Sequence, residues 1–370
     1  MLKQLPLLSC LLVLSFVADA QEPAEKVVIE EVKMSVSALT AGGHLLPDLK
    51  KEDLVIMDNG RLQQANAVRR VPANVLIMLD TGGTMRGNLS ATLSAAKALI
   101  GSLAEGDSIA VFQLSDKPHM IVDWTRDKAA AAEMIQKKLT FGRRTGLYRA
   151  MSEARGYFSE HRGENRHLVL ITAGIDSFND ETAKKAAMAE LLSTDINVNV
   201  ISYTQMQKGT VPRKREVIAQ GEWKPKRLPE EIVQTLPDPK RPEHPEDERE
   251  VTPREIAKIP RLAGVSLDFE RLTNARKISR ELDAAETFLE SVSTDTNGLF
   301  LLPETSDEMD EKAAALAALI DSQWVIAYTP KNTLSDAPPG EVRNIEVSSK
   351  RPGVQVQARR KLILKPTINP

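Results

Sequence analysis

The sequence predicts an α/β protein, in which a mostly parallel central sheet with helices on both faces is joined to a small β-sandwich formed by N- and C-terminal strands. Three observations predict this fold. Uninterrupted apolar runs at 75–79 and 168–171 are typical of strands buried on both faces of a parallel sheet. Segments with helical spacing alternate with such strands between residues 73 and 204. The two ends of the chain carry short strand-like runs instead, which favour a sandwich.

Composition argues against several classes of partner. The 370 residues carry a net charge of −2, with a pI of about 6.3, so no overall attraction to nucleic acid or to an anionic membrane is expected. Aromatic residues make up only 4% of the chain and lie scattered, which argues against a surface on which bases stack. We therefore expect no binding of nucleic acid.

Residues 1–20 are predicted to be a cleavable signal peptide. Lys3 provides the positive charge, 7–17 the short apolar stretch, and 18–20 the small-residue cleavage site. That stretch is too short to span a bilayer, and no other apolar run is long enough, so no membrane span is expected in the mature chain. The single cysteine, Cys10, lies within the signal, and an exported protein without disulfides fits a bacterial periplasmic or secreted protein.

Residues 21–72 are predicted to form the N-terminal part of the sandwich. The run 27–36 alternates toward its end, and 54–57 is a second strand. A turn signal at 58–60 precedes a third predicted strand at 62–71.

Residues 73–204 are predicted to form the first part of the α/β domain. The expected strands are 74–80, 107–114, 120–122, 168–171 and 196–203. The expected helices are 89–103, 126–139, 147–158 and 181–192. This alternation implies a parallel sheet with helices on both faces.

Residues 205–275 are predicted to be a charged, proline-rich insertion that is largely disordered. Basic residues come first, around 213–215, and acidic residues later, around 243–250. Such a segment buries too little apolar surface to offset the entropy lost on ordering. A solvated insertion and a docking tail for a charged partner both fit this composition.

Residues 276–322 are predicted to complete the α/β domain. The expected elements are a helix at 276–292, a strand at 298–302 and a helix at 306–320. Residues 323–370 return to strand character, and we expect them to pair with residues 21–72. Domain termini are often close together, and insertions are well tolerated at loops, so the α/β domain would be inserted within one sandwich.

A candidate site lies at the end of the first buried strand of the α/β domain. Asp80 ends this strand, and a short glycine loop with Thr84 follows it. In open α/β sheets, ligands bind in crevices outside the carboxyl ends of the strands. Carboxylate and hydroxyl oxygens suit hard cations such as Mg²⁺, so this edge of the sheet is a candidate metal site.

The segment from Asp80 to Thr84 resembles the first motif of the von Willebrand factor type A (VWA) family, which reads Asp-x-Ser-x-Ser. Gly82 stands in place of the first serine, and Thr84 replaces the second. Residues 142–148 resemble the family's second loop, which commonly reads Gly-x-Thr-x-Leu-Tyr, and Thr145 matches its threonine.

The third loop and the ends of the chain extend this resemblance. Where the family has Thr-Asp-Gly, residues 172–174 read Thr-Ala-Gly, and Asp176 follows shortly after. The resemblance covers 74–204 and roughly 280–322. The flanking strands are similar to those of a bacterial exported subgroup of VWA-related proteins.

The resemblance implies a Rossmann-like domain and a metal-ion-dependent adhesion site for Mg²⁺ or Mn²⁺. The residues that match its ligands, or could add to them, are Asp80, Thr84, Thr145 and Asp176. Gly82 has no hydroxyl and Ala173 no carboxylate, so we expect a degenerate site that binds the ion weakly or not at all. In the metal-free alternative, Asp80 caps the loop that follows it and Thr145 caps its helix.

The resemblance also implies an exported, non-enzymatic module that binds a protein, as an adhesion domain does. An intact site would bind an acidic residue of the partner through the ion. Without the ion, the same surface around Gly82 and Gly174 would bind through Arg143 and Arg144. The partner itself is not identified by the sequence.

The alternative function is a structural role in a cell-envelope assembly, through the β-sandwich and the charged insertion and without metal. An enzyme is not expected. The histidines show no metal-ligand spacing, and the sequence contains no phosphate-binding loop and no nucleophile elbow.

Overall fold

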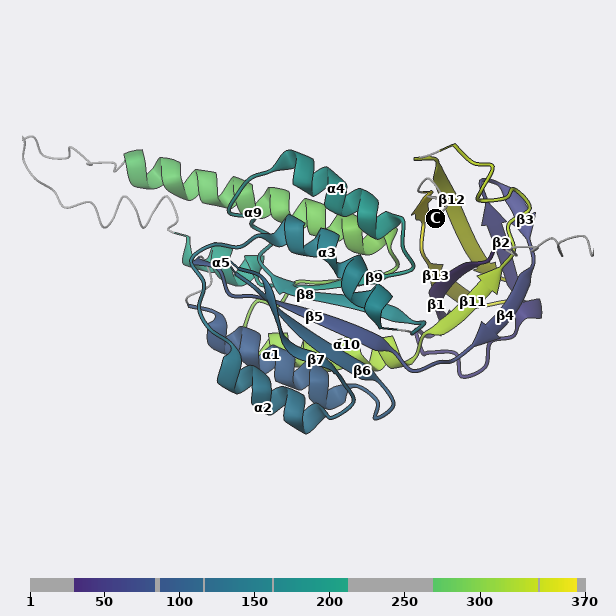
Figure 1. The fold of residues 1–370 in the computed structure, drawn as a ribbon, viewed down its shortest axis with the longest axis horizontal. Coiled ribbons are helices and arrows are strands. Elements are labelled where there is room, and N and C mark those ends of the chain that lie inside the picture. The colour runs from purple at the N-terminus through teal and green to yellow at the C-terminus, as the bar shows by residue number, and fades with distance from the viewer. Residues whose placement is uncertain are drawn as a thin grey trace, which may run out of the picture.

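The protein is described by a computed structural model over residues 30–83, 87–115, 117–161, 163–211, 269–338 and 340–364. The predicted signal peptide, Thr84 and the middle of the predicted insertion lie outside the described residues. An α/β domain lies beside a smaller β-sandwich (Figure 1). This arrangement confirms the predicted fold class.

The central sheet of the α/β domain contains strands in the order β10-β9-β8-β5-β6-β7. These strands are β5 (Asn74–Asp80), β6 (Ser108–Leu114), β7 (His119–Thr125), β8 (Arg166–Thr172), β9 (Asn197–Ser202) and β10 (Phe300–Leu301). Neighbouring strands are parallel except for β6 and β7, which are antiparallel. The carboxyl ends of β5, β8 and β9 therefore meet at one edge of the sheet.

Strand β5 shows why an apolar run forms the centre of this sheet. All of its residues are buried. Val75, Ile77 and Leu79 pack into the core on one face of the sheet. Leu76 and Met78 pack into the core on the other face. Because side chains alternate along a strand, only a run that is apolar throughout can fill both cores.

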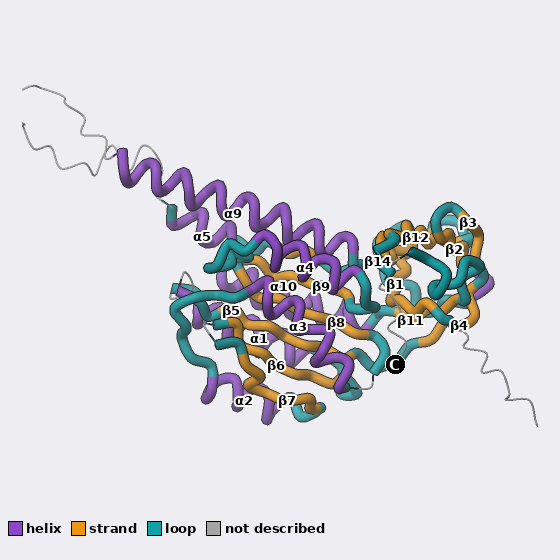
Figure 2. Tube along the Cα trace, turned by 45° about the horizontal axis from the view of Figure 1, so that its top comes forward, coloured by secondary structure: helices purple, strands orange, loops and turns teal. Residues whose placement is uncertain are grey.

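Helices cover both faces of the sheet (Figures 1 and 2). One face carries α1 (Leu89–Ser102), α2 (Lys128–Lys138) and α10 (Ser306–Asp321). The other carries α3 (Leu147–Glu160), α4 (Glu181–Leu192) and the C-terminal half of α9 (Phe269–Asp295). Within the described residues, no helix combines the length and apolar character needed to cross a membrane.

The β-sandwich is built from both ends of the chain, with strand orders β13-β1-β11-β4 and β14-β12-β2-β3. Its N-terminal strands are β1 (Val32–Thr40), β2 (Leu54–Asp58), β3 (Arg61–Gln63) and β4 (Ala65–Arg69), with a short 3-10 helix, η1 (Lys51–Asp53), before β2. Its C-terminal strands are β11 (Trp324–Tyr328), β12 (Val342–Ser349), β13 (Val354–Ala358) and β14 (Lys361–Ile363). Strand β1 pairs with β11 and β13, and β2 pairs with β12, so each sheet mixes the two ends.

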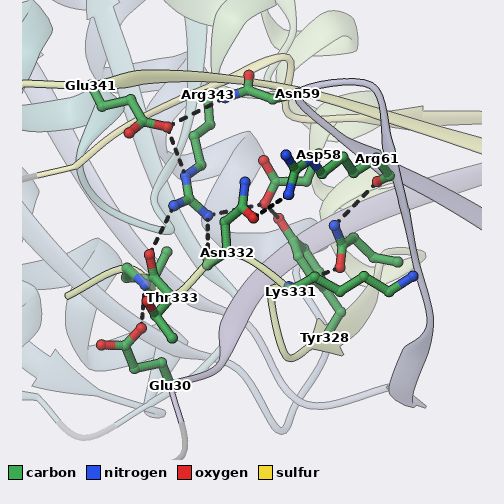
Figure 3. Close-up of polar contacts among 12 residues, drawn as sticks. Glu30, Asp58, Asn59, Arg61, Tyr328, Lys331, Asn332, Thr333, Glu341 and Arg343 are labelled. Atoms are coloured by element: carbon green, nitrogen blue, oxygen red, sulfur yellow. Dashed lines mark hydrogen bonds and ion pairs between the residues drawn. The ribbon is translucent and has the colours of Figure 1, made fainter. Parts of the chain in front are cut away.

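A buried polar cluster holds the sandwich together (Figure 3). The guanidinium of Arg343, which is 2% exposed, lies 3.3 Å from Oδ2 of Asp58. It also donates to the backbone carbonyls of Asn332 and Thr333, at 3.0 and 3.1 Å. The hydroxyl of Tyr328 donates to Asp58 at 3.1 Å. The buried charge is paired and hydrogen-bonded, which avoids the cost of burying it alone.

Two predicted elements differ from the structure in extent. The strand predicted at 62–71 is divided into β3 and β4. The helix predicted at 276–292 begins earlier, at Phe269, and α5 (Thr204–Thr210) follows β9 almost directly. Both edges of the segment predicted as a disordered insertion are therefore helical.

Ion pairs attach the first of these edges to α9. Lys208 of α5 lies 2.7 Å from the carboxylate of Asp283 and 2.8 Å from that of Glu286, both on α9. These acidic residues follow the insertion, while Lys208 lies at its start. Their contact is tertiary, so the local composition of the insertion does not reveal it.

Candidate functional site

Asp80 lies at the carboxyl end of β5 and is 1% exposed. Its Oδ1 accepts hydrogen bonds from the backbone N–H of Gly82 at 3.0 Å and from the hydroxyl of Thr145 at 2.7 Å. Its Oδ2 accepts from the hydroxyl of Thr172 at 2.7 Å. Burial raises the pKa of Asp80, and the three donors oppose this shift because they stabilise the carboxylate.

Two glycines bring the second loop directly against Asp80. A Cβ atom on Gly82 would lie 1.8 Å from Oγ1 of Thr145, and one on Gly83 would lie 2.4 Å from the carbonyl oxygen of Arg143. The N–H of Gly83 donates to that same carbonyl at 3.1 Å. The threonine hydroxyl therefore fills the space that a side chain at position 82 would need. In this packing, glycine replaces the serine of the family motif because there is no room for serine.

Gly174, in the third loop, faces the interior of the domain. Its backbone has φ +76°, and a Cβ atom would lie 2.6 Å from the side chain of Leu289 on α9. Its N–H donates to the hydroxyl of Thr172 at 2.9 Å. Ala173, in the place of the family's aspartate, is also buried. The expected contact of Gly82 and Gly174 with a partner does not agree with this conformation, since both residues are buried.

Asp176 caps a helix in this structure. It is 6% exposed, and its carboxylate accepts from the N–H of Phe178 at 2.8 Å and from the N–H of Tyr148, in the first turn of α3, at 3.3 Å. The expectation that Thr145 caps this helix is therefore wrong, because its hydroxyl is turned to Asp80. The expectation that Asp80 caps its own loop agrees with its bond from the N–H two residues later.

Two residues of the site were not among the predicted ligands. In the sequence, Thr172 is the first residue of the third-loop motif, and no role was predicted for it. Tyr203 directly follows β9, is fully buried, and has no sequence signal beyond this position. Burial and then the nearby carboxylate of Asp80 raise the pKa of Tyr203. Its hydroxyl lies close to Asp80 and Thr172 without a hydrogen bond of regular geometry to either.

The described residues do not fit a magnesium or manganese ion in this arrangement. Both oxygens of Asp80 are taken by donors, one of them the hydroxyl of Thr145, and Asp176 is turned to α3. No cluster of three or more His, Cys, Asp or Glu side chains suited to a metal occurs among the residues described, which do not include Thr84. An ion bound directly by Asp80 would compete with hydrogen bonds that already stabilise the buried carboxylate.

An exposed rim surrounds the buried site. Arg143 and Arg144 are exposed on the second loop, and Phe178, on the third, is 55% exposed. The guanidinium of Arg144 lies 5.8 Å from the ring centroid of Phe178, within the range of a cation–π contact. We call these three residues the rim. The rim brings positive charge and an apolar ring together on the surface.

A mostly parallel sheet with helices on both faces, and with loops hydrogen-bonded around one buried carboxylate, defines an α/β domain. The family model of the von Willebrand factor type A domain matches residues 75–175. These residues form a VWA domain. Domains of this family are generally non-catalytic modules of protein–protein interaction, and some bind Mg²⁺ or Mn²⁺.

Several solved structures show partial similarity to the chain. A von Willebrand factor type A protein from Catenulispora acidiphila is 11% identical, with 90% of this chain and 72% of that chain covered and a TM-score of 0.43. The conserved hypothetical protein BatB from Bacteroides thetaiotaomicron is 14% identical, with 67% and 98% covered and a TM-score of 0.39. An aerotolerance-related membrane protein from Bacteroides fragilis is 17% identical, with 66% and 98% covered and a TM-score of 0.36. No curated protein matches the sequence.

Proposed function

We propose that the protein is an exported, non-enzymatic binding module whose VWA domain engages a protein partner without a resident metal ion. One observation carries this proposal. The carboxylate of Asp80 is buried, and its two oxygens accept three hydrogen bonds from Gly82, Thr145 and Thr172. The degenerate adhesion site thus serves to hold the loops of the domain in place.

The rim provides the contact surface in this proposal. An acidic side chain of the partner, which would complete the coordination of an ion in an intact site, instead pairs with Arg143 or Arg144. The exposed ring of Phe178 adds apolar area beside these charges. The partner is therefore expected to carry a carboxylate next to an apolar residue.

Export rests on the predicted signal peptide at residues 1–20. Its positive start, short apolar stretch and small-residue cleavage site are typical of secreted and periplasmic proteins. Fusion of residues 1–30 to a reporter that is active only outside the cytoplasm tests this part. An inactive reporter would contradict export.

A photo-crosslinking residue at Phe178 tests the rim in cells of the source organism, with Met134 on α2 as the matched position. Met134 is 37% exposed, and α2 lies on the opposite face of the central sheet from α3, which follows the second loop. We expect a discrete crosslinked product at 178 only, which persists in the presence of a chelator. The double substitution Arg143→Glu and Arg144→Glu is expected to abolish it.

Calorimetric titration of the purified protein with MgCl₂ and MnCl₂ tests the metal-free state. We expect no saturable heat. Saturable binding that disappears in Asp80→Asn would contradict the proposal, as would a crosslink at 178 that the chelator removes. Equal crosslinking with and without the two arginine substitutions would exclude the rim.

A further inference from the structure

The connections between the β-sandwich and the α/β domain lie close together in the structure. The chain enters the α/β domain through residues 70–73, between β4 and β5, and returns to the sandwich through residues 322–323, between α10 and β11 (Figure 1). Asp321, the last residue of α10, contacts Asp107, which directly precedes β6. Because β5 and β6 are parallel, both connections adjoin the edge of the sheet opposite to Asp80.

Asp107 binds the first connection. It is 2% exposed, and its Oδ1 accepts from the N–H of Ala73 at 2.7 Å. Its Oδ2 accepts from the N–H of Ala104, in the loop after α1, at 3.0 Å. The carbonyl of Ala73 in turn accepts from the N–H of Ser108 at 2.9 Å. The first connection is therefore fixed to the start of β6, and each oxygen of Asp107 already has a donor.

Asp321 brings a second carboxyl to the same place. It is half-buried, and its Oδ1 is buried without a hydrogen bond of regular geometry to a described residue. Its carboxyl lies within hydrogen-bond reach of that of Asp107. Two ionised carboxylates repel each other at this separation, whereas one proton between them forms an O–H···O bond. Since both oxygens of Asp107 already accept an N–H, the proton belongs to Asp321, which donates to Asp107.

The charges around the pair favour this protonated state. The groups that act on Asp321 are the carboxyl of Asp107 and the ammonium of Lys128, in the first turn of α2. The ammonium donates to the carbonyl of Leu103, at the end of α1, and forms no ion pair with either of these two described carboxyls. Burial, and then the carboxyl of Asp107, raise the pKa of Asp321 to about 7, and Lys128 opposes this shift.

The second connection has other contacts that do not involve the pair. Gln323 is 6% exposed, and its Oε1 accepts from Nδ2 of Asn197, at the start of β9, at 3.0 Å. The hydroxyl of Ser322 donates to the carbonyl of Leu319 at 2.7 Å. These contacts hold the second connection to β9 and to α10. The carboxyl pair adds the contact that joins it to the first connection.

We propose that Asp107 and Asp321 form a proton-dependent latch, in which one proton shared by the two carboxyls joins the two connections between the domains. When this proton leaves, two carboxylates face each other, and Asp321 turns toward water and Lys128. The end of α10 is then released from the start of β6, while Asn197 still holds Gln323. The latch is separate from the rim and does not depend on the function proposed for the VWA domain.

The first test is urea unfolding as a function of pH. Asp321→Asn keeps a donor for Asp107 but does not titrate, and Glu105→Gln removes an exposed carboxylate from the same loop as the matched control. An unfolded aspartate loses its proton near about pH 4, so between about pH 4 and 7 only the folded wild type holds the proton. Circular dichroism verifies that both variants are folded.

The unfolding equilibrium constant of the wild type, relative to Asp321→Asn, should rise about tenfold per pH unit from pH 4.5 to 7 and then stay constant. Glu105→Gln should follow the wild type. The contribution of His167 cancels because all three proteins contain it. A wild type that runs parallel to Asp321→Asn over this range would overturn the shared proton.

The second test observes the latch directly, by nuclear magnetic resonance of protein labelled with ¹³C at the aspartate carboxyls. We expect one wild-type resonance with a midpoint near pH 7, absent in Asp321→Asn, while exposed aspartates titrate near about pH 4. Amide protection at Ser322 and Gln323, corrected for the intrinsic pH dependence of exchange, should fall about tenfold from pH 6 to pH 8 in the wild type only.

Two outcomes of this second test would contradict the latch. If every aspartate of the wild type titrates below about pH 5, no proton is shared at neutral pH. A midpoint near neutral pH with unchanged protection of Ser322 and Gln323 would show that the proton does not join the two connections. The wild-type titration needs no variant to fold, so it decides the first point by itself.

Discussion

Asp80 accepts three hydrogen bonds on a carboxylate that is 1% exposed. The carboxylate oxygens of Asp80 could serve as metal ligands. Here their hydrogen bonds connect the ends of β5 and β8 with the second loop. Gly82 is a consequence of this arrangement, because Thr145 occupies the space beside it. At the residue scale, glycine at position 82 and the inward direction of the Thr145 hydroxyl therefore belong to one packing arrangement.

A double-mutant cycle tests this link between Gly82 and Thr145. Gly82→Ala should lower the free energy of unfolding by about 1–3 kcal/mol, since its methyl group overlaps the threonine hydroxyl. Thr145→Ala should cost about 1.5–3 kcal/mol, as a hydrogen bond to a carboxylate is lost. In the double variant the worst overlap, 1.8 Å to Oγ1 of Thr145, is gone and only contacts of 3.0–3.1 Å remain, so the combined loss should be smaller than the sum. Urea unfolding provides the three values, and strict additivity would contradict the clash.

At the same scale, His167 makes the stability of the folded protein depend on pH. It is fully buried, and its ring nitrogens lie 2.9 Å from Oδ1 of Asn165 and 3.4 Å from Nδ2 of Asn199. Burial lowers the pKa of His167 to about 3, whereas an unfolded histidine binds a proton below about pH 6.5. The unfolded state therefore binds more protons between these values, and stability falls as the pH falls.

The substitution His167→Gln isolates this contribution. Between about pH 6.5 and pH 4, the wild-type protein should lose about 1.4 kcal/mol per pH unit relative to the variant. Urea unfolding of both proteins at about pH 7.5 and pH 4.5 measures the difference. A constant difference between the two proteins at both pH values would show that the histidine is protonated in the folded state.

At the scale of the element, helix α10 begins with a cap whose sequence signal is local. The hydroxyl of Thr305 accepts from the N–H of Glu308 at 3.2 Å, and the carboxylate of Glu308 accepts from the N–H of Glu304 at 2.7 Å. This Thr-x-x-Glu pattern is typical of a helix start. Ser306, the residue next to the cap, is exposed and lies in the first turn.

Thr305→Ala should lower the free energy of unfolding by about 1 kcal/mol, because the first turn of α10 loses its capping oxygen. Ser306→Ala is the matched control, and we expect a change within about 0.5 kcal/mol. Thermal unfolding of the two variants compares them directly. Equal shifts would mean that the cap does not contribute.

At the scale of the whole molecule, Arg359 joins the sandwich to the α/β domain. Its side chain is 2% exposed and donates to the carbonyls of Ile196 at 2.9 Å and of Leu191, at the end of α4, at 3.4 Å. Burial lowers the pKa of Arg359 to about 10. Glu164, on the α/β side, also pairs with Lys33 of the sandwich at 2.9 Å.

Arg359→Ala should lower the free energy of unfolding by about 2–4 kcal/mol, because two buried carbonyls lose their donor and a cavity remains. Arg360→Ala, at the exposed neighbour, should change it by less than about 0.5 kcal/mol. Calorimetry should show one transition for the wild-type protein. Two separate transitions in the wild type, or equal effects of the two substitutions, would contradict a rigid junction.

The sequence by itself determined the fold class and the family that residues 75–175 match. The apolar runs at 75–79 and 168–171 could only be buried on both faces, and pattern alone locates such strands. The loop motifs placed Asp80 and Thr145 at one edge of the sheet. The strand character of both chain ends indicated the shared sandwich.

Only the tertiary structure decided how the site is satisfied. Thr145 and Thr172 are 65 and 92 residues from Asp80 in the sequence, and helical crossovers bring their hydroxyls to it. The direction of each hydroxyl depends on packing, which turns Thr145 inward and Asp176 to α3. Local sequence encodes which residues form strands and loops, whereas long-range packing decides which of their polar groups remain free.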